Sequence, residues 1–387
     1  MPILVISFDG VGDIAYEKMA ANAADYPNIA ALKRDGYYKN AVSTVFLSST
    51  YPIHATVSTG KLPKDHGIIS NYADATRSDD AAEWAQMANM INGKTIWDCA
   101  KQKRLKTAAF LWPVSCGAKI DYHIPEYHKQ AGENQIICNL KYGSKLFQLK
   151  TFLKYKHLLD GIKQPNLDNF TTAAVCNLLD KLDKTEKNPK KNVDLVLVHL
   201  IAYDDFCHRY GNGNTQPAQK ALDENLGKLL KSWGNKPVIV FSDHSQLDVA
   251  EVVNLENILP DTFVQNGGSA FLKNAKILED TEKSAKIDGL QNQPWFGRFL
   301  TSDELAESGQ PSKLGIAAKV GYSFGNKPLK GDHGYPSNYE NFQIFYNTIN
   351  TKKNISHSLK GTICDVTAII AHELQLDMEI LDEYGLR

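Results

Sequence analysis

The sequence has almost no net charge, no paired cysteine motif and no long apolar run. Its 43 basic and 44 acidic residues leave a formal net charge of −1, so nothing indicates the basic surface of a protein that binds a nucleic acid polymer. The longest apolar stretch, residues 194–203, is far shorter than the roughly 20 residues that a membrane helix needs. We therefore expect no nucleic acid partner and no membrane segment.

The amino terminus, MPILVISFDG, lacks the basic residues and the long apolar core of a signal peptide, so we expect a cytoplasmic location. The six cysteines are scattered and form no CxxC pair, which favours reduced, mostly buried thiols over disulfides. With 387 residues, of which 43% are hydrophobic and 22% charged, the chain has the composition of a soluble globular protein with a large core.

Short apolar runs alternate along the chain with amphipathic helical patterns. The runs are rich in β-branched residues, as in strands buried on both faces of a parallel sheet, and cover residues 3–8, 107–111, 193–199 and 238–241. Helical patterns cover residues 28–33 and 218–231. This alternation predicts a single α/β domain over residues 1–387, with a mostly parallel sheet and helices on both faces.

Two regions break this pattern. Residues 117–165 are rich in Tyr, His and Lys, residues 250–328 are rich in Gly, Asn and Pro, and both are only weakly periodic. We expect them to be inserts that form cap or lid segments on the core. The charged segment 181–192 is expected to be a solvated loop.

Three candidate acids follow predicted strands. Asp9 comes directly after ILVISF and Asp243 after VIVFS, and Asp204 comes a few residues after VDLVLVHL. In an open α/β sheet, ligands gather just beyond the carboxyl ends of the strands. The sequence therefore predicts that three carboxylates meet at one edge of the sheet.

Histidines accompany these acids. His208 follows Asp204 by four residues. His244 is adjacent to Asp243, and His333 lies in GDHGY. Each pattern alone is weak, because an Asp after a strand is usually a cap and a DH dipeptide or a glycine-flanked turn arises by chance. Together, mixed Asp and His ligands suit two divalent ions such as Zn²⁺, which can clamp the attacking and leaving oxygens of a displacement at phosphorus.

The segment SSTYPIHATVSTGKLPKDHGIISN holds a candidate nucleophile, Thr50. A Thr followed by Pro52 at the start of an apolar helical pattern is typical of a helix N-cap, and a cap alone would explain the residue. A hydroxyl at that place also faces the positive end of the helix dipole, where a phosphate binds. A nearby metal could lower the pKa of the hydroxyl so that it attacks as an alkoxide.

These residues resemble the alkaline phosphatase superfamily and, within it, the nucleotide pyrophosphatase/phosphodiesterase family. The resemblance covers most of the chain and comprises six motifs in order. FDG resembles the family's first metal motif, STYPIHATVSTGKLPKDHGIISN its nucleophile segment, and LWPVS its WPGS element. DDFCHRYG, SDHS and GDHGYPS resemble the later motifs PDxxGHxyGP, SDHGM and GxHGYxN. The resemblance implies an alkaline-phosphatase-like α/β core and hydrolysis of phosphodiester or nucleotide pyrophosphate bonds.

The resemblance also implies a role for each candidate residue. Thr50 would be the nucleophile that forms a covalent phospho-threonine, and Asn71 would donate a hydrogen bond to a phosphate oxygen. The metal that activates Thr50 would be held by Asp9, Asp243, His244 and the Thr50 hydroxyl itself, and the second metal by Asp204, His208 and His333. Zn²⁺ is the expected ion, with Mn²⁺ and Fe as alternatives. The expected partner is a small phosphate ester, with nucleotides among the candidates.

Several positions near the motifs depart from the family's pattern. The family usually has Asn at Ile53, Pro at Tyr203, Gly at Cys207, and Gly-Met at Ser245 and Gln246. No ligand and no nucleophile is replaced, so the departures bear on the substrate, and Tyr203 is expected near the pocket wall as a substrate-binding residue. Tyr51 stands where the family often stacks an aromatic ring on a nucleobase, although a core aromatic on the first helical turn explains it equally well.

Other functions within this chemistry stay open. A sulfatase is excluded, because its modified Cys or Ser in a CxPxR-like context is here TYPIH, with no Arg. A phosphomonoesterase usually needs an Arg or a third metal at the free phosphate oxygens, and Arg209 merely follows a ligand. A phosphonate hydrolase and an inactive metal-binding homologue are further alternatives, and the oligomeric state is left open.

Overall fold

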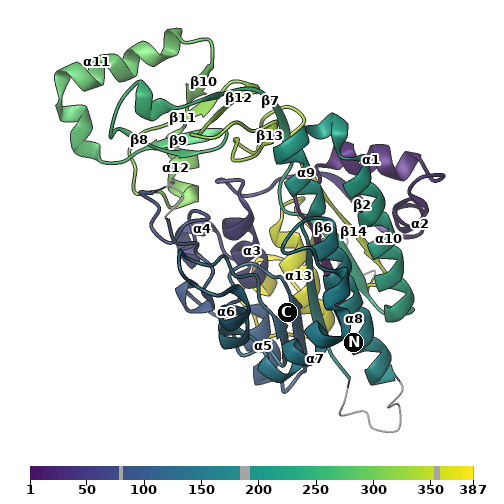
Figure 1. Cartoon of the computed structure of the whole chain (residues 1–387). Coiled ribbons are helices and arrows are strands. Elements are labelled where there is room, and N and C mark those ends of the chain that lie inside the picture. The colour runs from purple at the N-terminus through teal and green to yellow at the C-terminus, as the bar shows by residue number, and fades with distance from the viewer. Residues whose placement is uncertain (78–81, 184–191, 353–357, 387) are drawn as a thin grey trace.

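A seven-stranded sheet forms the centre of this computed structural model, which describes residues 1–77, 82–183, 192–352 and 358–386. Its strands are β1 (Ile3–Phe8), β2 (Tyr37–Val42), β3 (Thr107–Phe110), β4 (Tyr122–Ile124), β5 (Leu195–Leu200), β6 (Val238–Ser242) and β14 (Ile344–Ile349). They lie in the order β2-β14-β6-β1-β5-β3-β4 (Figure 1). Strands β1, β3, β4, β5 and β6 run parallel, whereas β14 is antiparallel to β6 and β2.

Helices cover both faces of this sheet. One face packs against α3 (Thr50–Thr59), α5 (Ile96–Gln102) and α13 (Cys364–Leu374). The other packs against α1 (Asp13–Ala21), α2 (Pro27–Asp35), α8 (Asn166–Asp183) and α10 (Gln216–Trp233). Successive side chains of a strand point to opposite faces, so Ile3 and Val5 of β1 enter the first core while Leu4 and Ile6 enter the second.

The four predicted strands are all present, each within two residues of its expected bounds. The two predicted helices are also present, as α2 and α10. Burial on both faces explains why these strands were recognisable as continuous apolar runs. The prediction of a mostly parallel sheet with helices on both faces is therefore confirmed.

A smaller β-rich region lies beside the main sheet, at the upper left of Figure 1. It contains a three-stranded sheet of β7 (Leu247–Val253), β12 (Gly321–Phe324) and β13 (Gly331–Asp332), and a four-stranded sheet of β8 (Phe263–Asn266), β9 (Ser269–Leu272), β10 (Phe296–Phe299) and β11 (Gly315–Ala318). Helices α11 (Thr281–Gly289) and α12 (Ser302–Ser308) belong to the same stretch, and a separate apolar core fills it. Residues 250–328, expected as an insert, supply most of this region.

Residues 117–165, the other expected insert, contribute to the main sheet through β4, which pairs with β3. The remainder includes α6 (Gln135–Tyr142) and α7 (Lys145–Tyr155). The expected loop 181–192 lies mostly outside the described residues. The division of the chain into one domain with two inserts stays a prediction. None of the described helices is long and apolar enough to cross a bilayer.

Helix α3 begins at Thr50, and the N-cap residue before it is Ser49. The expectation that Thr50 is itself the N-cap is therefore off by one position, which is within the usual uncertainty of helix boundaries. Every residue of α3 is buried, because the helix packs between the sheet and α13. The candidate nucleophile thus lies on the first turn of a fixed helix that points its amino terminus at the carboxyl ends of the strands.

A buried carboxylate from a distant helix holds the start of α9 (Ala202–Tyr210), the helix that carries Asp204 and His208. Ile201, the residue that precedes α9, provides no side-chain cap. Instead, the carboxylate of Asp168 on α8 accepts the N–H of Ile201 at 3.1 Å and of Ala202 at 2.9 Å. Asp168 therefore fixes where the first turn of α9 lies relative to the sheet.

Replacing Asp168 with Ala is expected to lower the free energy of unfolding by about 2 kcal/mol, because two buried N–H groups lose their acceptor. Urea unfolding measures the change. Asp280→Ala is the matched control, since Asp280 caps α11 through two N–H groups at an exposed position, and it should cost about 1 kcal/mol or less. Equal losses in the two variants would contradict a special role for the buried cap.

Candidate metal centre and nucleophile

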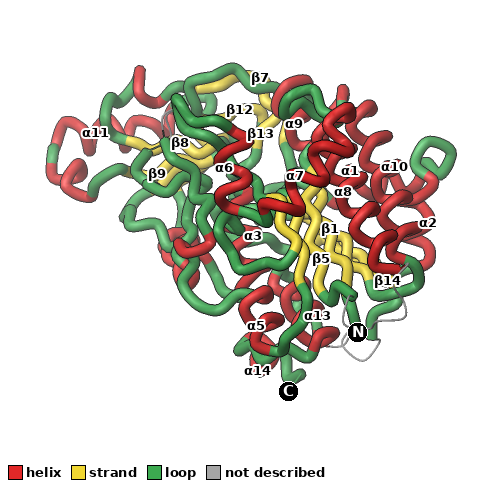
Figure 2. The backbone as a smooth tube through the Cα atoms, turned by 60° about the horizontal axis from the view of Figure 1, so that its bottom comes forward, coloured by secondary structure: helices red, strands yellow, loops and turns green. Residues whose placement is uncertain are grey.

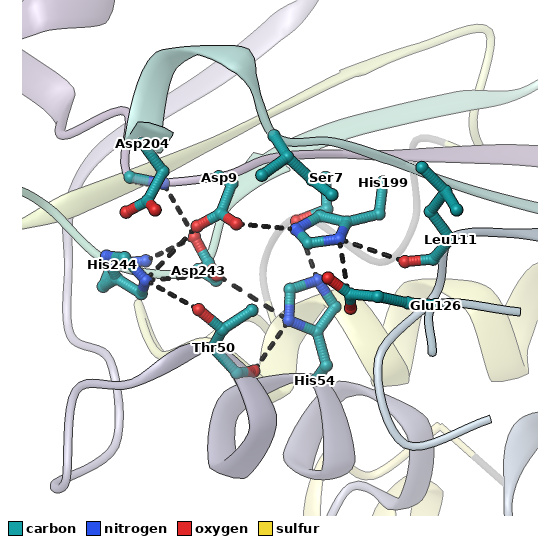
Figure 3. A network of polar contacts seen from close by, with 12 residues as sticks. Ser7, Asp9, Thr50, His54, Leu111, Glu126, His199, Asp204, Asp243 and His244 are labelled. Carbon is teal, nitrogen blue, oxygen red and sulfur yellow. Dashed lines mark hydrogen bonds and ion pairs between the residues drawn. The ribbon is translucent and has the colours of Figure 1, made fainter. Parts of the chain in front are cut away.

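Asp9 and Asp243 follow the neighbouring strands β1 and β6, and His244 comes next in the chain. Oδ1 of Asp9 lies 3.3 Å, and Oδ2 of Asp243 3.5 Å, from Nε2 of His244. All three side chains are buried, and one ligand atom from each lies within 4.8 Å of the others. The structure therefore brings together the three residues expected to hold the first metal, here called the first triad (Figure 3).

The close packing of the first triad depends on Gly10. Its φ is +72°, a conformation that strains residues with a Cβ. Its N–H donates to Oδ1 of Asp243 at 3.1 Å, and a Cβ at this position would lie 3.1 Å from Oδ1 of Asp204. Glycine therefore lets the chain after β1 pass between two carboxylates.

Asp204, His208 and His333 form a second group with the same metal-ligand spacing, here called the second triad. Asp204 and His208 lie one turn apart on α9, with Oδ2 of Asp204 3.4 Å from Nε2 of His208. Nδ1 of His208 donates to the carbonyl of Gly331 in β13, the strand that directly precedes His333. Burial alone would raise the pKa of Asp204, but the charge of the neighbouring His208 holds it below its usual value.

Thr50 lies against the first triad. Its Oγ1 is 3.2 Å from Nε2 of His244, and Thr50 is buried. The ring of His244 lies 4.1 Å from the ring of His333, so the two triads adjoin. The six residues and the hydroxyl that the sequence singled out thus converge on one place, although their roles stay predictions.

The donor atoms of this cluster fit divalent metal ions. Oδ1 of Asp9, Oδ2 of Asp243 and Nδ1 of His333 are buried, and none has a hydrogen-bond partner among the described residues. Burial and the nearby charges of Asp243 and Asp204 raise the pKa of Asp9 well above its usual value. Burial lowers the pKa of His244 and of His333 to about 4, which leaves both imidazoles neutral, the form that binds a metal.

Asn71 lies beside the start of α3. Its Oδ1 accepts the N–H of Tyr51 at 3.0 Å, which leaves the Nδ2 group available as a donor. His66, at the end of α4 (Pro63–His66), orders the intervening loop, because Nδ1 accepts the N–H of Ile68 at 3.1 Å and Nε2 donates to Oγ1 of Thr56 at 3.0 Å. The HGIISN part of the nucleophile segment therefore serves to return Asn71 to the helix start.

Tyr51 is covered by other aromatic rings. It is 1% exposed, with the ring of Trp84 at 5.2 Å and the ring of His128 at 6.2 Å. Trp84 and His128 stack on each other at 4.0 Å and are both partly exposed. The structure therefore places Tyr51 as a core aromatic that the rings of Trp84 and His128 cover.

Tyr203 lines a cavity of about 500 Å³ together with Gly10, Asn212 and Gln246. The tyrosine is 3% exposed, and its hydroxyl lies 3.5 Å from Oδ1 of Asn212. Cys207 is also buried, and its Sγ lies 3.2 Å from the same oxygen. All six cysteines are free, so the expectation of reduced thiols agrees with the structure.

Two buried histidines behind the first triad were missed in the sequence. His199 places Nε2 3.1 Å from Oδ2 of Asp9, and its Nδ1 donates to the carbonyl of Leu111 at 3.1 Å. His54 donates from Nδ1 to the carbonyl of Thr50 at 2.8 Å, and its Nε2 accepts from Oγ of Ser7 at 3.0 Å. These contacts connect the backbone of the nucleophile to the strand that carries Asp9 (Figure 3).

Each missed histidine left a signal in the sequence. His199 is a polar residue in the otherwise apolar run VDLVLVHL, and its register partner on β1 is Ser7. His54 follows Thr50 by four residues, which is one helical turn. Polar residues on buried strands and helices need hydrogen-bond partners, so both positions indicate a buried polar network.

Gln246 is a third residue whose role the sequence did not reveal. Its Nε2 donates to Oδ1 of Asp204 and lies 3.4 Å from Nε2 of His208. Its Oε1 is buried and has no hydrogen-bond partner among the described residues. The amide therefore holds one oxygen of Asp204 and leaves Oδ2 facing His208, as expected for a residue that orients a metal ligand.

Comparison with known proteins places these residues in a family context. A family model described as type I phosphodiesterase / nucleotide pyrophosphatase matches residues 3–294. An ectonucleotide pyrophosphatase/phosphodiesterase from Caenorhabditis elegans is 24% identical over 362 residues, which are 88% of this chain and 42% of that protein. A bis(5'-adenosyl)-triphosphatase from Xenopus laevis is 21% identical over 377 residues, which are 89% of this chain and 71% of that protein. The chain thus spans about two fifths of the nematode relative.

Several relatives are named as ecto-enzymes, so the expected cytoplasmic location is not confirmed.

The fold has known counterparts. Murine ectonucleotide pyrophosphatase/phosphodiesterase 5 matches with a TM-score of 0.67 and 17% identity over 100% of both chains. An inactive variant of the same mouse protein in complex with AMP matches with the same score over 100% of this chain and 99% of that one. At this identity the likeness concerns the fold alone, and it confirms the expected alkaline-phosphatase-like architecture.

Gln246→Met is expected to weaken Zn²⁺ binding at the second triad by about 10- to 100-fold, because the ligand Asp204 loses the donor that orients it. Met is also the residue that the family usually has at this position. Isothermal titration with Zn²⁺ measures the change. Gln219→Met is the matched control, because Gln219 lines the same cavity and hydrogen-bonds Tyr26 and Thr215 rather than a candidate ligand. Unchanged affinity in Gln246→Met would show that Asp204 needs no such support.

Proposed function

The chain belongs to the type I phosphodiesterase / nucleotide pyrophosphatase family, and from this premise we propose that it is a two-metal hydrolase that cleaves phosphodiester or nucleotide pyrophosphate bonds through a phospho-threonine at Thr50. The observation that carries the proposal is the position of the Thr50 hydroxyl, 3.2 Å from His244 where the two triads adjoin. A threonine that served only as a helix residue would not need to lie among six potential metal ligands.

The two triads are proposed to hold one ion each. Asp9, Asp243 and His244 would bind the ion beside Thr50, and Asp204, His208 and His333 would bind the other. Mixed carboxylate and imidazole ligands suit Zn²⁺ best, with Mn²⁺ and Fe as alternatives. When bound, the ions would supply positive charge for the attacking and leaving oxygens.

The first chemical step uses the Thr50 hydroxyl. Its oxygen attacks phosphorus as the bond from phosphorus to the leaving-group oxygen breaks, the threonine proton passes through solvent to that oxygen, and a phospho-threonine forms. Water then cleaves the new ester and restores Thr50. The amino terminus of α3 would direct its positive dipole end toward the phosphate, which favours the developing negative charge.

Asn71 is proposed to donate from Nδ2 to a non-bridging phosphate oxygen. The backbone N–H of Tyr51 already occupies its Oδ1, so the amide is oriented before a substrate arrives. A donor that needs no reorganisation stabilises charge more effectively than water does. Asn71 would therefore act as one hydrogen-bond donor of an oxyanion hole.

The charges around the nucleophile favour a diester over a monoester. A monoester dianion carries an extra charged oxygen that an Arg usually meets, and the nucleophile segment contains none. Arg209, which follows the ligand His208, is 54% exposed and pairs with Asp205, so it is engaged at the surface. Phosphomonoester and phosphonate hydrolysis are therefore secondary candidates.

The substrate is proposed to be a small phosphate ester, with nucleotides as the leading class because of the family. The frog relative is named for the hydrolysis of a dinucleoside triphosphate, and the inactive mouse protein was solved with AMP. A nucleobase would meet the exposed rings of Trp84 and His128 before it could reach Tyr51. Base stacking on Tyr51 and substrate contact by Tyr203 stay predictions, as does the oligomeric state.

Thr50→Ala is expected to abolish turnover of a nitrophenyl phosphodiester, because the nucleophilic oxygen is lost. Zn²⁺ binding should persist, because the six Asp and His ligands remain in place. Steady-state kinetics and Zn²⁺ titration measure the two properties on the same preparation. Thr59→Ala on the same helix is the control, since the Thr59 hydroxyl donates to the carbonyl of Ala55 at the other end of α3, and it should retain turnover. Substantial turnover by Thr50→Ala would mean that water attacks directly and that the threonine is only structural.

Diesters or nucleotide pyrophosphate bonds are expected to be cleaved faster than monoesters, and Asn71→Ala should lower kcat by about 10²–10³. Parallel assays with nitrophenyl phosphodiester, nitrophenyl phosphate and a dinucleotide measure the preference. Asn89→Ala, an exposed asparagine outside the site, is the control. Monoester turnover tenfold or more above diester turnover would overturn the diesterase assignment.

A further inference from the structure

Exposed apolar side chains concentrate in one stretch of the chain that has no part in the candidate site. Of the twelve large hydrophobic side chains that are exposed among the described residues, half lie within residues 136–162. They are Ile136, Ile137, Leu146, Leu149, Leu153 and Ile162. Scattered single exposures are ordinary on a protein surface, whereas a cluster of this kind marks a contact surface.

Helix α7 arranges three of these residues as a stripe. Leu146, Leu149 and Leu153 lie within about 60° of one another around the helix, given 3.6 residues per turn, and are 64%, 47% and 61% exposed. The opposite side of the helix faces the core through Phe147, whose ring packs on Phe110 at 5.9 Å. The leucine stripe therefore points away from the protein rather than into an unfilled part of its core.

Lysines border the leucine stripe on both sides. Lys145 lies on one side, and Lys150 and Lys154 lie on the other. Residues 134–159 contain five lysines and no acidic residue, in a chain whose formal net charge is only −1. Lys154 hydrogen-bonds Asn177 at 2.7 Å, whereas Lys145 and Lys150 have no ion pair with any described residue. The border of the stripe is therefore a local positive field.

We propose that the outer face of α7 docks on the surface of a bilayer that contains anionic lipid, with the leucines entering the headgroup region and the lysines contacting lipid phosphates or carboxylates. An apolar stripe flanked by lysines is the pattern of helices that lie in the membrane interface. Each lysine near an anionic leaflet adds to the attraction. The surface is separate from the proposed hydrolase function and does not depend on it.

The charge pattern disfavours a second copy of the chain as the occupant. A symmetric pairing of two α7 faces would bring Lys145 and Lys150 of one copy against the lysines of the other, and like charges repel. An anionic bilayer supplies both the apolar layer that the leucines need and the negative charge that the lysines need. In Figure 2, α6 and α7 lie on the near side of the molecule, in front of the main sheet.

Vesicle cosedimentation tests the proposal with the full chain. The protein is expected to sediment with vesicles of phosphatidylcholine and phosphatidylserine, to sediment far less with phosphatidylcholine alone, and to dissociate as salt is raised. Lys145→Glu/Lys150→Glu should weaken the partition coefficient by at least 25-fold, since about 1 kcal/mol per lysine is roughly fivefold each. Leu146→Ser/Leu149→Ser/Leu153→Ser should weaken it by about tenfold or more.

Matched controls separate this surface from general effects. Lys220→Glu/Lys228→Glu on α10 makes the same charge change at side chains that are 50% and 55% exposed, and Ile258→Ser removes an apolar residue that is 42% exposed elsewhere. Both controls should keep a partition coefficient on anionic vesicles within about twofold to threefold of the wild-type value. The small loss expected of the α10 lysine pair comes only from the change in net charge. Circular dichroism and the urea unfolding midpoint show whether every variant is folded, independently of the proposed hydrolase function.

Three outcomes would overturn the proposal. The first is equal sedimentation with and without phosphatidylserine. The second is a loss in the α10 control as large as that in the α7 lysine variant, which would mean that overall charge governs binding. The third is wild-type binding by the leucine variant, which would leave only an electrostatic contact and favour an acidic protein as the partner.

Discussion

Mutual repulsion among buried carboxylates is the constraint on which the rest of the site depends. Asp9, Asp204 and Asp243 come from three different elements. Asp9 and Asp243 are buried, whereas the Asp204 side chain is 14% exposed, and burial and the other two charges raise the pKa of Asp9. Isolated buried charges are too costly to persist without compensation. Bound metal ions would balance these charges, and the neutral imidazoles of His244 and His333, together with the carboxylate oxygens that lack hydrogen-bond partners, suit them as ligands.

The architecture produces this crowding as a consequence of parallel strands. Neighbouring strands β1 and β6 end at the same edge, and the buried cap at Asp168 brings the first turn of α9 to that edge as well. The smaller β-rich region contributes His333, which follows β13, so the second triad joins α9 to the three-stranded sheet. Behind the ligands, His54 and His199 link the start of α3 to β1, and this rigid backing keeps the Thr50 hydroxyl beside His244.

Much of the fold and the place of the site could be predicted from the sequence, because strands buried on both faces leave continuous apolar runs and their carboxyl ends share one edge. The strands of the smaller region left no such runs, because most of them have four residues or fewer and β7 alternates between buried and exposed positions. The sequence left Tyr51 open between base stacking and a core position, because its burial depends on the rings of Trp84 and His128 from other segments of the chain. Likewise, Gln246 reaches Asp204 only through tertiary packing.

Anomalous diffraction at the zinc edge from crystals grown with Zn²⁺ tests the central claim most directly. The account predicts two peaks about 4 Å apart, one bound by Asp9, Asp243 and His244 and the other by Asp204, His208 and His333. The buried group of His54, His199 and Asp243 also has metal-ligand spacing, but its histidines are already hydrogen-bonded to Thr50, Ser7 and Leu111. A single peak, or a peak within that third group instead of at either triad, would contradict the account.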